Sequence, residues 1–144
     1  MQPFHLLIER EFDVYKEMMD MKIICKQSPD NLYAEEAKKL SKDKEIIVCA
    51  FCHNHIADPS KQIAIHQSFR HIFANPHGYV FEIGCFSDVI NCCPASTLSN
   101  EFPWFIGYSW QIGICTRCST HLGWYFSSES NSFWGLILEK LVFP

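Results

Sequence analysis

The sequence lacks a basic excess, a long apolar run and an apolar leader. Its 144 residues carry 12 Lys and Arg against 16 Asp and Glu, which gives a net charge of −4. Binding driven by nucleic-acid phosphates needs a basic face, so we expect no nucleic-acid partner. No apolar run reaches about 18 residues, which predicts no membrane partner. Charged residues interrupt the first turns of the chain, so a secretory signal peptide is not expected either.

Without a leader, the chain is expected in the reducing cytoplasm. The eight cysteines are then expected to be metal ligands and buried thiols rather than disulfides. Apolar residues make up 48% of the chain, which is enough for one hydrophobic core.

The pattern of apolar and turn residues changes near residue 44. Residues 4–22 and 29–40 show apolar residues at helical spacing, whereas short β-rich runs alternate with turn residues from position 45 onward. The sequence therefore predicts a helical N-terminal extension over 1–44 and a mainly β domain over 45–144. The expected strands are 45–50, 63–66, 80–86, 107–114, 122–126 and 136–141.

Two C-x-x-C motifs, Cys49–Cys52 and Cys115–Cys118, stand far apart in the β region. Two intervening residues let both sulfurs of a motif face one ion, and four thiolates complete a closed tetrahedral zinc site. Because such a site leaves no open position for water, one structural Zn²⁺ is expected. A single C-x-x-C could instead be a redox dithiol, but two of them after β-like runs favour zinc.

The remaining cysteines and nearby histidines are not needed as ligands. We expect the former to be buried or incidental thiols and the latter to serve packing or hydrogen bonding. They are Cys25, Cys85, Cys92, Cys93, His53, His55 and His121.

Large aromatic residues surround the second motif. Trp104 and Trp110 precede it, and Trp124 and Phe126 follow it. Residues 124 and 126 of one strand point to the same face, so three Trp rings could wall a small box. Core packing is the competing interpretation, because Trp and Phe in β domains are usually buried.

Six segments in this order resemble the thalidomide-binding (CULT) domain family of cereblon, and in particular its single-domain, bacterial-type members. The resemblance covers about 48–143. The matching segments are Cys49–Cys52, Asn75-Pro-His-Gly-Tyr79, Trp104-Phe-Ile-Gly-Tyr-Ser-Trp110, Cys115–Cys118, His121-Leu-Gly-Trp124 and Phe133-Trp-Gly-Leu136.

The resemblance implies a β-tent, in which two antiparallel sheets meet near the zinc. It also implies a binding module, not an enzyme, whose three-Trp cage takes cyclic imides such as glutarimide and thalidomide-type or uracil-like rings. Cyclic imides at protein C-termini would be related partners. Carried over by position, the ligand-binding residues are Asn75, Pro76, Phe102, Trp104, Trp110, Trp124 and Phe126.

The chain departs from the family at two cage positions. Phe102 stands where animal cereblon has His, and Pro103 replaces Ser, so only a main-chain role for Phe102 carries over. The 1–44 extension is too short for cereblon's Lon-like domain and adaptor-docking helices, so ubiquitin-ligase function is not expected.

Two other functions fit parts of the pattern. A zinc-containing methionine sulfoxide reductase on the same fold would need a reactive Cys85, Cys92 or Cys93. An aromatic cage for a methyl-ammonium group would use the same three Trp rings. The sequence specifies neither the oligomeric state nor the physiological ligand.

Overall fold

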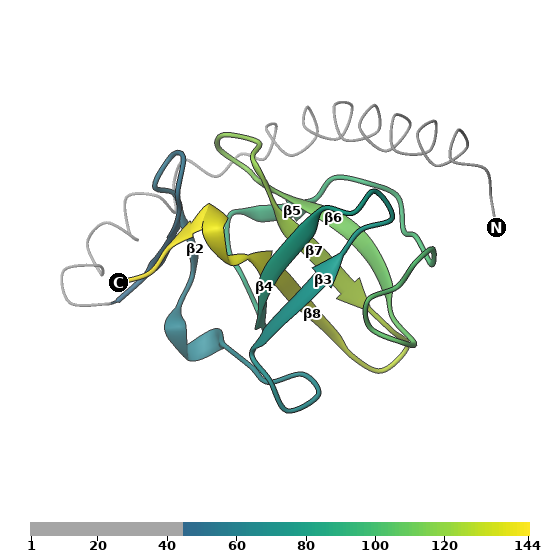
Figure 1. The fold of residues 1–144 in the computed structure, drawn as a ribbon. Helices are drawn as coiled ribbons and strands as arrows, with labels where there is room; N and C mark the ends of the chain where they lie inside the picture. Colours follow the sequence, from purple (N-terminus) through teal and green to yellow (C-terminus); the bar gives the residue numbers. More distant parts are fainter. Residues whose placement is uncertain (1–44) are drawn as a thin grey trace.

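The computed structural model describes residues 45–144, and the predicted helices over 1–44 lie outside them. The described part is mainly β and forms two antiparallel sheets, as the sequence predicts (Figure 1). Among these residues, no helix is long and apolar enough to cross a bilayer.

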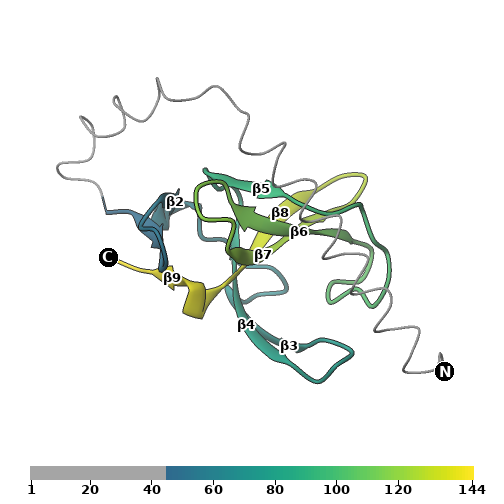
Figure 2. The ribbon, with the colours of Figure 1, turned by 90° about the horizontal axis from the view of Figure 1, so that it is seen from above.

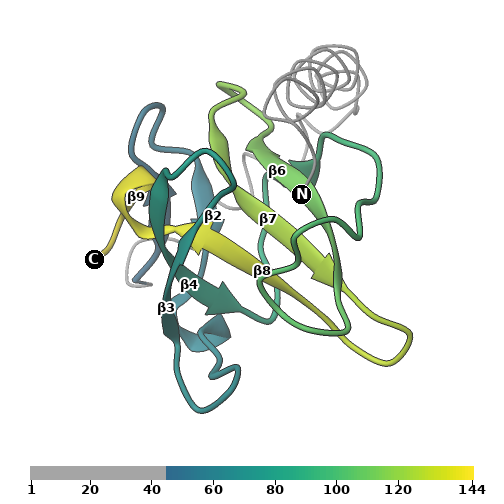
Figure 3. The same cartoon turned by 45° about the vertical axis from the view of Figure 1, so that its right-hand side comes forward.

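The larger sheet has six strands in the order β3-β4-β8-β7-β6-β5. Figure 3 shows β4, β8, β7 and β6 lying side by side across the molecule. The strands are β3 (Arg70–Ala74), β4 (Val80–Phe86), β5 (Cys92–Pro94), β6 (Ser109–Cys115), β7 (His121–Ser127) and β8 (Ser132–Ile137).

The smaller sheet has three strands in the order β2-β1-β9. It combines the start of the described chain, β1 (Ile47–Cys49) and β2 (His55–Ala57), with its end, β9 (Leu141–Val142). Seen from above, β2 and β9 lie together at one side, away from the β3–β4 hairpin (Figure 2). Two single 3-10 turns, η1 (Pro59–Lys61) and η2 (Leu138–Lys140), lie in the connections.

Exposed and half-buried side chains alternate along β3, because only one face of this strand packs against the rest of the domain. In β3, Arg70, Ile72 and Ala74 face solvent, whereas His71 and Phe73 are half-buried. The central strands β7 and β8 are covered on both faces and are accordingly almost continuously apolar.

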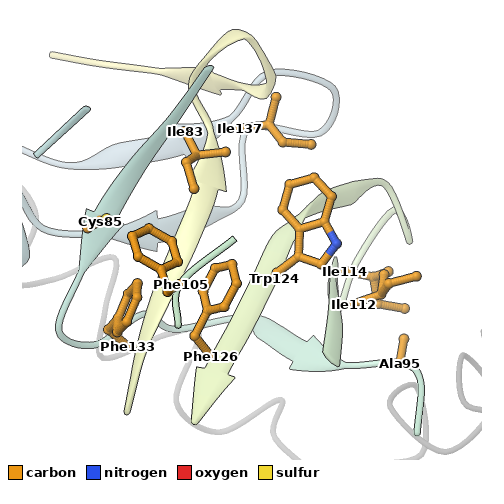
Figure 4. Packing of buried hydrophobic residues seen from close by; sticks show 10 residues of the cluster. All are labelled: Ile83, Cys85, Ala95, Phe105, Ile112, Ile114, Trp124, Phe126, Phe133 and Ile137. Atoms are coloured by element: carbon orange, nitrogen blue, oxygen red, sulfur yellow. The ribbon is translucent and has the colours of Figure 1, made fainter. Parts of the chain in front are cut away.

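The buried side chains form two clusters. The first lies on one face of the large sheet and contains Phe105, Trp124, Phe126 and Phe133 (Figure 4). The second lies between the two sheets and is centred on Ile47, Ile56, Phe86, Leu122 and Trp134.

Two predicted strands need correction. Residues 63–66 form no strand, because His66 has a positive φ in a tight turn, where only an Ile65–Ser68 bridge forms. The predicted strand over 136–141 is interrupted by η2, which carries the chain from the large sheet to the small one.

Candidate functional site

The two C-x-x-C motifs adopt the same local backbone geometry. In the first, Cys49 N–H donates to Asn54 O at 2.9 Å, and Cys49 O accepts from His53 N–H at 2.9 Å. In the second, Cys115 N–H donates to Thr120 O and Cys115 O accepts from Ser119 N–H, again at 2.9 Å. His53 and Ser119 both have positive φ, so each motif is a tight knuckle that turns its two sulfurs to one side.

The four sulfurs converge on one point. They lie within 4.8 Å of one another, and the cross-knuckle pairs Cys49–Cys118 and Cys52–Cys115 are each separated by 3.6 Å. A disulfide would bring two sulfurs to about 2 Å. A tetrahedral ion with Zn–S bonds of about 2.3 Å holds its sulfurs about 3.8 Å apart. The separations therefore suit four thiolates around a metal ion.

The ionisation of these thiols also favours a cation among them. Burial raises the pKa of Cys52 to about 12, and contacts with Cys115 and Cys118 add to the rise. Burial opposes ionisation of Cys118, but the Thr120 hydroxyl and backbone amide, with Cys49 and Cys52, lower its pKa to about 7. The negative charge of one thiolate opposes ionisation of the neighbouring thiols. A divalent cation is the group that would allow all four thiols to ionise.

The cysteine cluster joins the two sheets. Cys49 ends β1 of the small sheet, and Cys115 ends β6 of the large one. Figures 1 and 3 show the loops that follow these strands side by side at one end of the molecule. A bound ion would hold both sheets together through two knuckles, Cys49–Cys52 and Cys115–Cys118, that 62 residues of the chain separate.

Trp104 and Trp124 are in direct ring contact. Their centroids are 4.6 Å apart and their planes meet at 70°. Phe73 stacks on Trp104 at 5.0 Å, and Phe81 meets Trp124 edge-on at 5.2 Å. The two indoles therefore lie against the face of the β3–β4 hairpin that carries Phe73 and Phe81. The sequence analysis did not predict this contact.

Trp110 reaches the same face through strand register. It lies opposite Phe126 on β7, and Ile112 lies opposite Trp124. Opposite residues of antiparallel strands point the same way, and diagonal neighbours lie about 7–8 Å apart. Trp110 is thus a diagonal neighbour of Trp124, and its indole N–H donates to Glu101 O at 2.7 Å.

The Asn75–Tyr79 turn joins β3 to β4, and Pro76 lies in it. The Asn75 side-chain oxygen accepts from the backbone N–H groups of His77 at 3.0 Å and Tyr79 at 2.9 Å. Gly78 has φ +84°, a conformation that favours glycine. Beside the turn, Trp104 Nε1 donates to Ala74 O at 3.2 Å and so fastens the hairpin to the Trp-bearing loop.

The two phenylalanines of the predicted site lie in different surroundings. Phe102 is 56% exposed with φ +47°, so its ring points away from the core while its backbone orientation is fixed. Phe126 is 2% exposed and stacks on Phe133 within the core. Figure 4 shows Phe126 and Trp124 projecting from β7 to the same face, as the strand periodicity predicts.

His121 serves packing and hydrogen bonding, as the sequence analysis expected: it meets Trp124 edge-on at 4.8 Å, and its Nε2 bonds to Gly123 O at 2.9 Å. Sequence reasoning missed other side chains around the Trp rings. Phe105 lies among five aromatic rings and anchors the loop between Trp104 and Trp110. Alternation of Phe73 and Phe81 with exposed residues was the available signal, but the strand β3 had not been predicted.

The other described cysteines are not among the four converging sulfurs, although Cys92 lies directly opposite Cys115 in the β5–β6 pair. Burial raises the pKa of the Cys85 thiol to about 12, and it also raises the pKa of Cys92. Cys93 is disulfide-bonded, which corrects the expectation that it is a thiol.

The chain matches none of the known protein-family models. Among curated proteins it is similar to cereblons. It is 35% identical to protein cereblon of Gallus gallus over 75 residues, covering 49% of this chain and 17% of that protein. It is 31% identical to protein cereblon of Drosophila simulans over 107 residues, covering 69% of this chain and 18% of that protein.

Among solved structures, the fold is similar to the Mis18 "Yippee-like" domain with a TM-score of 0.48 and 14% identity. That match covers 69% of this chain and 93% of the Mis18 domain. The sequence matches support a cereblon-like family, and the chain spans less than one fifth of the length of the curated relatives that it matches.

Proposed function

We propose that residues 45–144 form a binding module that holds one structural Zn²⁺ and takes a small cyclic imide between Trp104, Trp110 and Trp124. The observation that carries this proposal is that Trp110 and Trp124 share one face of the β6–β7 pair while Trp104 contacts Trp124 and bonds to Ala74 beside the turn of Asn75. The similarity to cereblons in sequence supports it.

The chemistry of a cyclic imide matches this arrangement. Its ring has an apolar CH₂ side, which indole faces desolvate, and an uncharged edge with one N–H donor between two C=O acceptors. A buried polar edge left unmatched would cost about 1–3 kcal/mol. The backbone groups of Phe102 and Trp104 lie on the loop that borders the indoles and are the proposed partners of that edge.

The proposed ligands are free glutarimide-type or uracil-like rings and cyclic imides at the C-termini of proteins. The module is proposed to bind rather than to catalyse. Within residues 45–144, burial raises the pKa of Cys85 and Cys92 and Cys93 is disulfide-bonded, so this part of the chain offers a reductase mechanism no favoured thiolate outside the metal cluster.

Titration of the full chain with glutarimide, followed by Trp fluorescence, tests the proposal. We expect saturable quenching in the wild type and its loss in Trp110→Ala. Trp110 is half-buried at one end of β6 and packs against the first core cluster without being one of its buried members.

Phe51→Ala is the matched control, because Phe51 is 64% exposed on the first knuckle and outside the Trp site. It should bind as the wild type does. Absence of quenching at millimolar glutarimide, or equal affinity in Trp110→Ala, would refute the proposed site. A competition experiment with trimethylammonium tests whether the same site binds a cation. We expect trimethylammonium not to displace bound glutarimide.

A further inference from the structure

Each knuckle carries a polar side chain at the same position, directly after its residue of positive φ. The first knuckle has Asn54 after His53, and the second has Thr120 after Ser119. Their carbonyl groups accept equivalent backbone hydrogen bonds from Cys49 and Cys115, both at 2.9 Å. The two side chains are therefore held in related places beside the four sulfurs.

Both side chains contact a sulfur of the cluster. Asn54 Nδ2 donates to Cys115 Sγ at 3.9 Å, and so crosses from the first knuckle to the second. Thr120 Oγ1 lies 3.0 Å from Cys118 Sγ within its own knuckle. Because a thiolate has no proton to donate, the Thr120 hydroxyl is the donor once the sulfur binds a metal.

A third residue fixes the orientation of the Asn54 amide. Asn91 Nδ2 lies 3.4 Å from Asn54 Oδ1 and 2.9 Å from His55 O. An NH₂ group can only donate, so it faces the Asn54 oxygen and leaves the Asn54 NH₂ directed at Cys115. Asn54 is 9% exposed, so water competes little for this amide.

Donors of this kind suit the charge of the proposed centre. Four thiolates around one divalent cation leave a net charge of about −2, part of which resides on the sulfurs. Nearby backbone amides act to lower the pKa of three of the ligands: those of Phe51 and Cys52 act on Cys49, that of Asn54 on Cys52, and that of Thr120 on Cys118. For Cys115, the Asn54 side chain supplies a donor from across the site.

We propose that Asn54 and Thr120 are paired positioning residues, which hydrogen-bond to the metal-bound sulfurs of Cys115 and Cys118 and lower their electron density. The inference rests on the metal site of the proposed function and is independent of the Trp cage. Partners of metal ligands typically change metal affinity by about 10–100-fold when they are removed.

Substitution with Co²⁺ gives a spectroscopic test, because the sulfur-to-cobalt charge-transfer band reports electron density on the sulfurs. The variants are Asn54→Leu and Thr120→Val, which keep the approximate side-chain size and remove the donor. We expect both to move this band to longer wavelength and to weaken Zn²⁺ binding by about 10–100-fold against a chelator. Thr120→Ser retains the hydroxyl and should restore the wild-type band, and Ile72→Ala, at a 70% exposed position on β3, should not move it.

The outcomes separate this inference from the metal site itself. If the bands of Asn54→Leu and Thr120→Val coincide with that of the wild type, the two side chains serve only folding and the inference is wrong. If Asn54→Leu does not fold, Thr120→Val decides the result, because Thr120 is only half-buried. A wild-type chain that binds neither Co²⁺ nor Zn²⁺ would overturn the metal site and this inference with it.

Discussion

Gly123 on β7 lies close to the backbone of the neighbouring strand β8. A Cβ at this position would overlap Gly135 O and lie 2.8 Å from Leu136 Cα, both in the backbone of β8. Backbone atoms of a central strand cannot move aside as a flexible side chain can. We therefore expect Gly123→Ala to lower the free energy of unfolding by about 3 kcal/mol, measured by urea denaturation of the zinc-loaded chain.

Ser132→Ala provides the comparison for Gly123→Ala, because Ser132 is exposed on β8, the strand whose backbone Gly123 approaches. It should change the free energy of unfolding by less than about 0.5 kcal/mol. A Gly123→Ala protein as stable as Ser132→Ala would show that the strands are not packed this closely.

His121 gives the domain a defined pH dependence. Burial lowers its pKa to about 4, nearby Lys140 adds to this effect, and the hydrogen bond to Gly123 O opposes it. The unfolded state binds a proton near pH 6.5, whereas the folded state resists it until about pH 4. Stability from this group is therefore complete above pH 6.5 and is lost as the pH falls toward 4.

Replacement of His121 by Gln should remove this contribution. We expect the free energy of unfolding to fall less steeply between pH 6.5 and pH 4.5 in His121→Gln than in the wild type. Loss of metal at acidic pH affects both proteins, so the difference between their slopes isolates His121. Identical slopes would contradict a neutral, buried imidazole.

At the scale of elements, Phe105 anchors the loop that carries Trp104. Its ring is 1% exposed and packs edge-on against Phe73, Phe126 and Phe133 at 4.9–5.2 Å. Phe105→Ala should lower the free energy of unfolding by about 3–5 kcal/mol. Ile106→Ala, at the adjacent and 90% exposed position, should stay within about 0.5 kcal/mol of the wild type in the same urea titration.

The β3–β4 turn depends on the side-chain oxygen of Asn75. Asn75→Ala removes the acceptor for two backbone N–H groups, whereas Asn75→Asp keeps an oxygen in place. We expect Asn75→Ala to lower the free energy of unfolding by about 1 kcal/mol and to weaken glutarimide binding, with both effects largely absent in Asn75→Asp. If Asn75→Asp loses binding as fully as Asn75→Ala, the amide itself contacts the ligand.

The sequence predicted a strand correctly where the residues of that strand carried a clear β pattern by themselves. The strand at 80–86 was predicted with its observed bounds, because it is a continuous β-rich run between turn residues. β3 was missed because its alternation of exposed and half-buried residues spans only Arg70–Ala74, a short run that forms a strand by pairing with β4. β9 has two residues and exists through its partner β1, so no local period could identify it.

For the whole molecule, the four-cysteine site was predictable and the surroundings of the indoles were not. Spacing alone identifies a C-x-x-C knuckle, and the structure brings both knuckles together as expected. The contacts of Trp104 with Phe73 and Trp124 depend on how a loop and a hairpin meet across the sheet. That long-range packing has no signature in the sequence around any one of these residues.

The metal site and the Trp face are linked through one hairpin. β6 carries Trp110 and ends at Cys115, the second knuckle forms the turn, and β7 carries Trp124. A bound ion would fix the end of this hairpin against β1 of the small sheet. The account therefore makes ligand binding depend on metal, although the metal does not contact the ligand.

The most direct test is a glutarimide titration of the full chain, followed by Trp fluorescence, before and after removal of metal by a chelator. We predict saturable quenching in the zinc-loaded protein, its loss after chelation and its return when Zn²⁺ is restored. Equal binding with and without metal, or no binding in either state, would contradict a zinc-supported imide site.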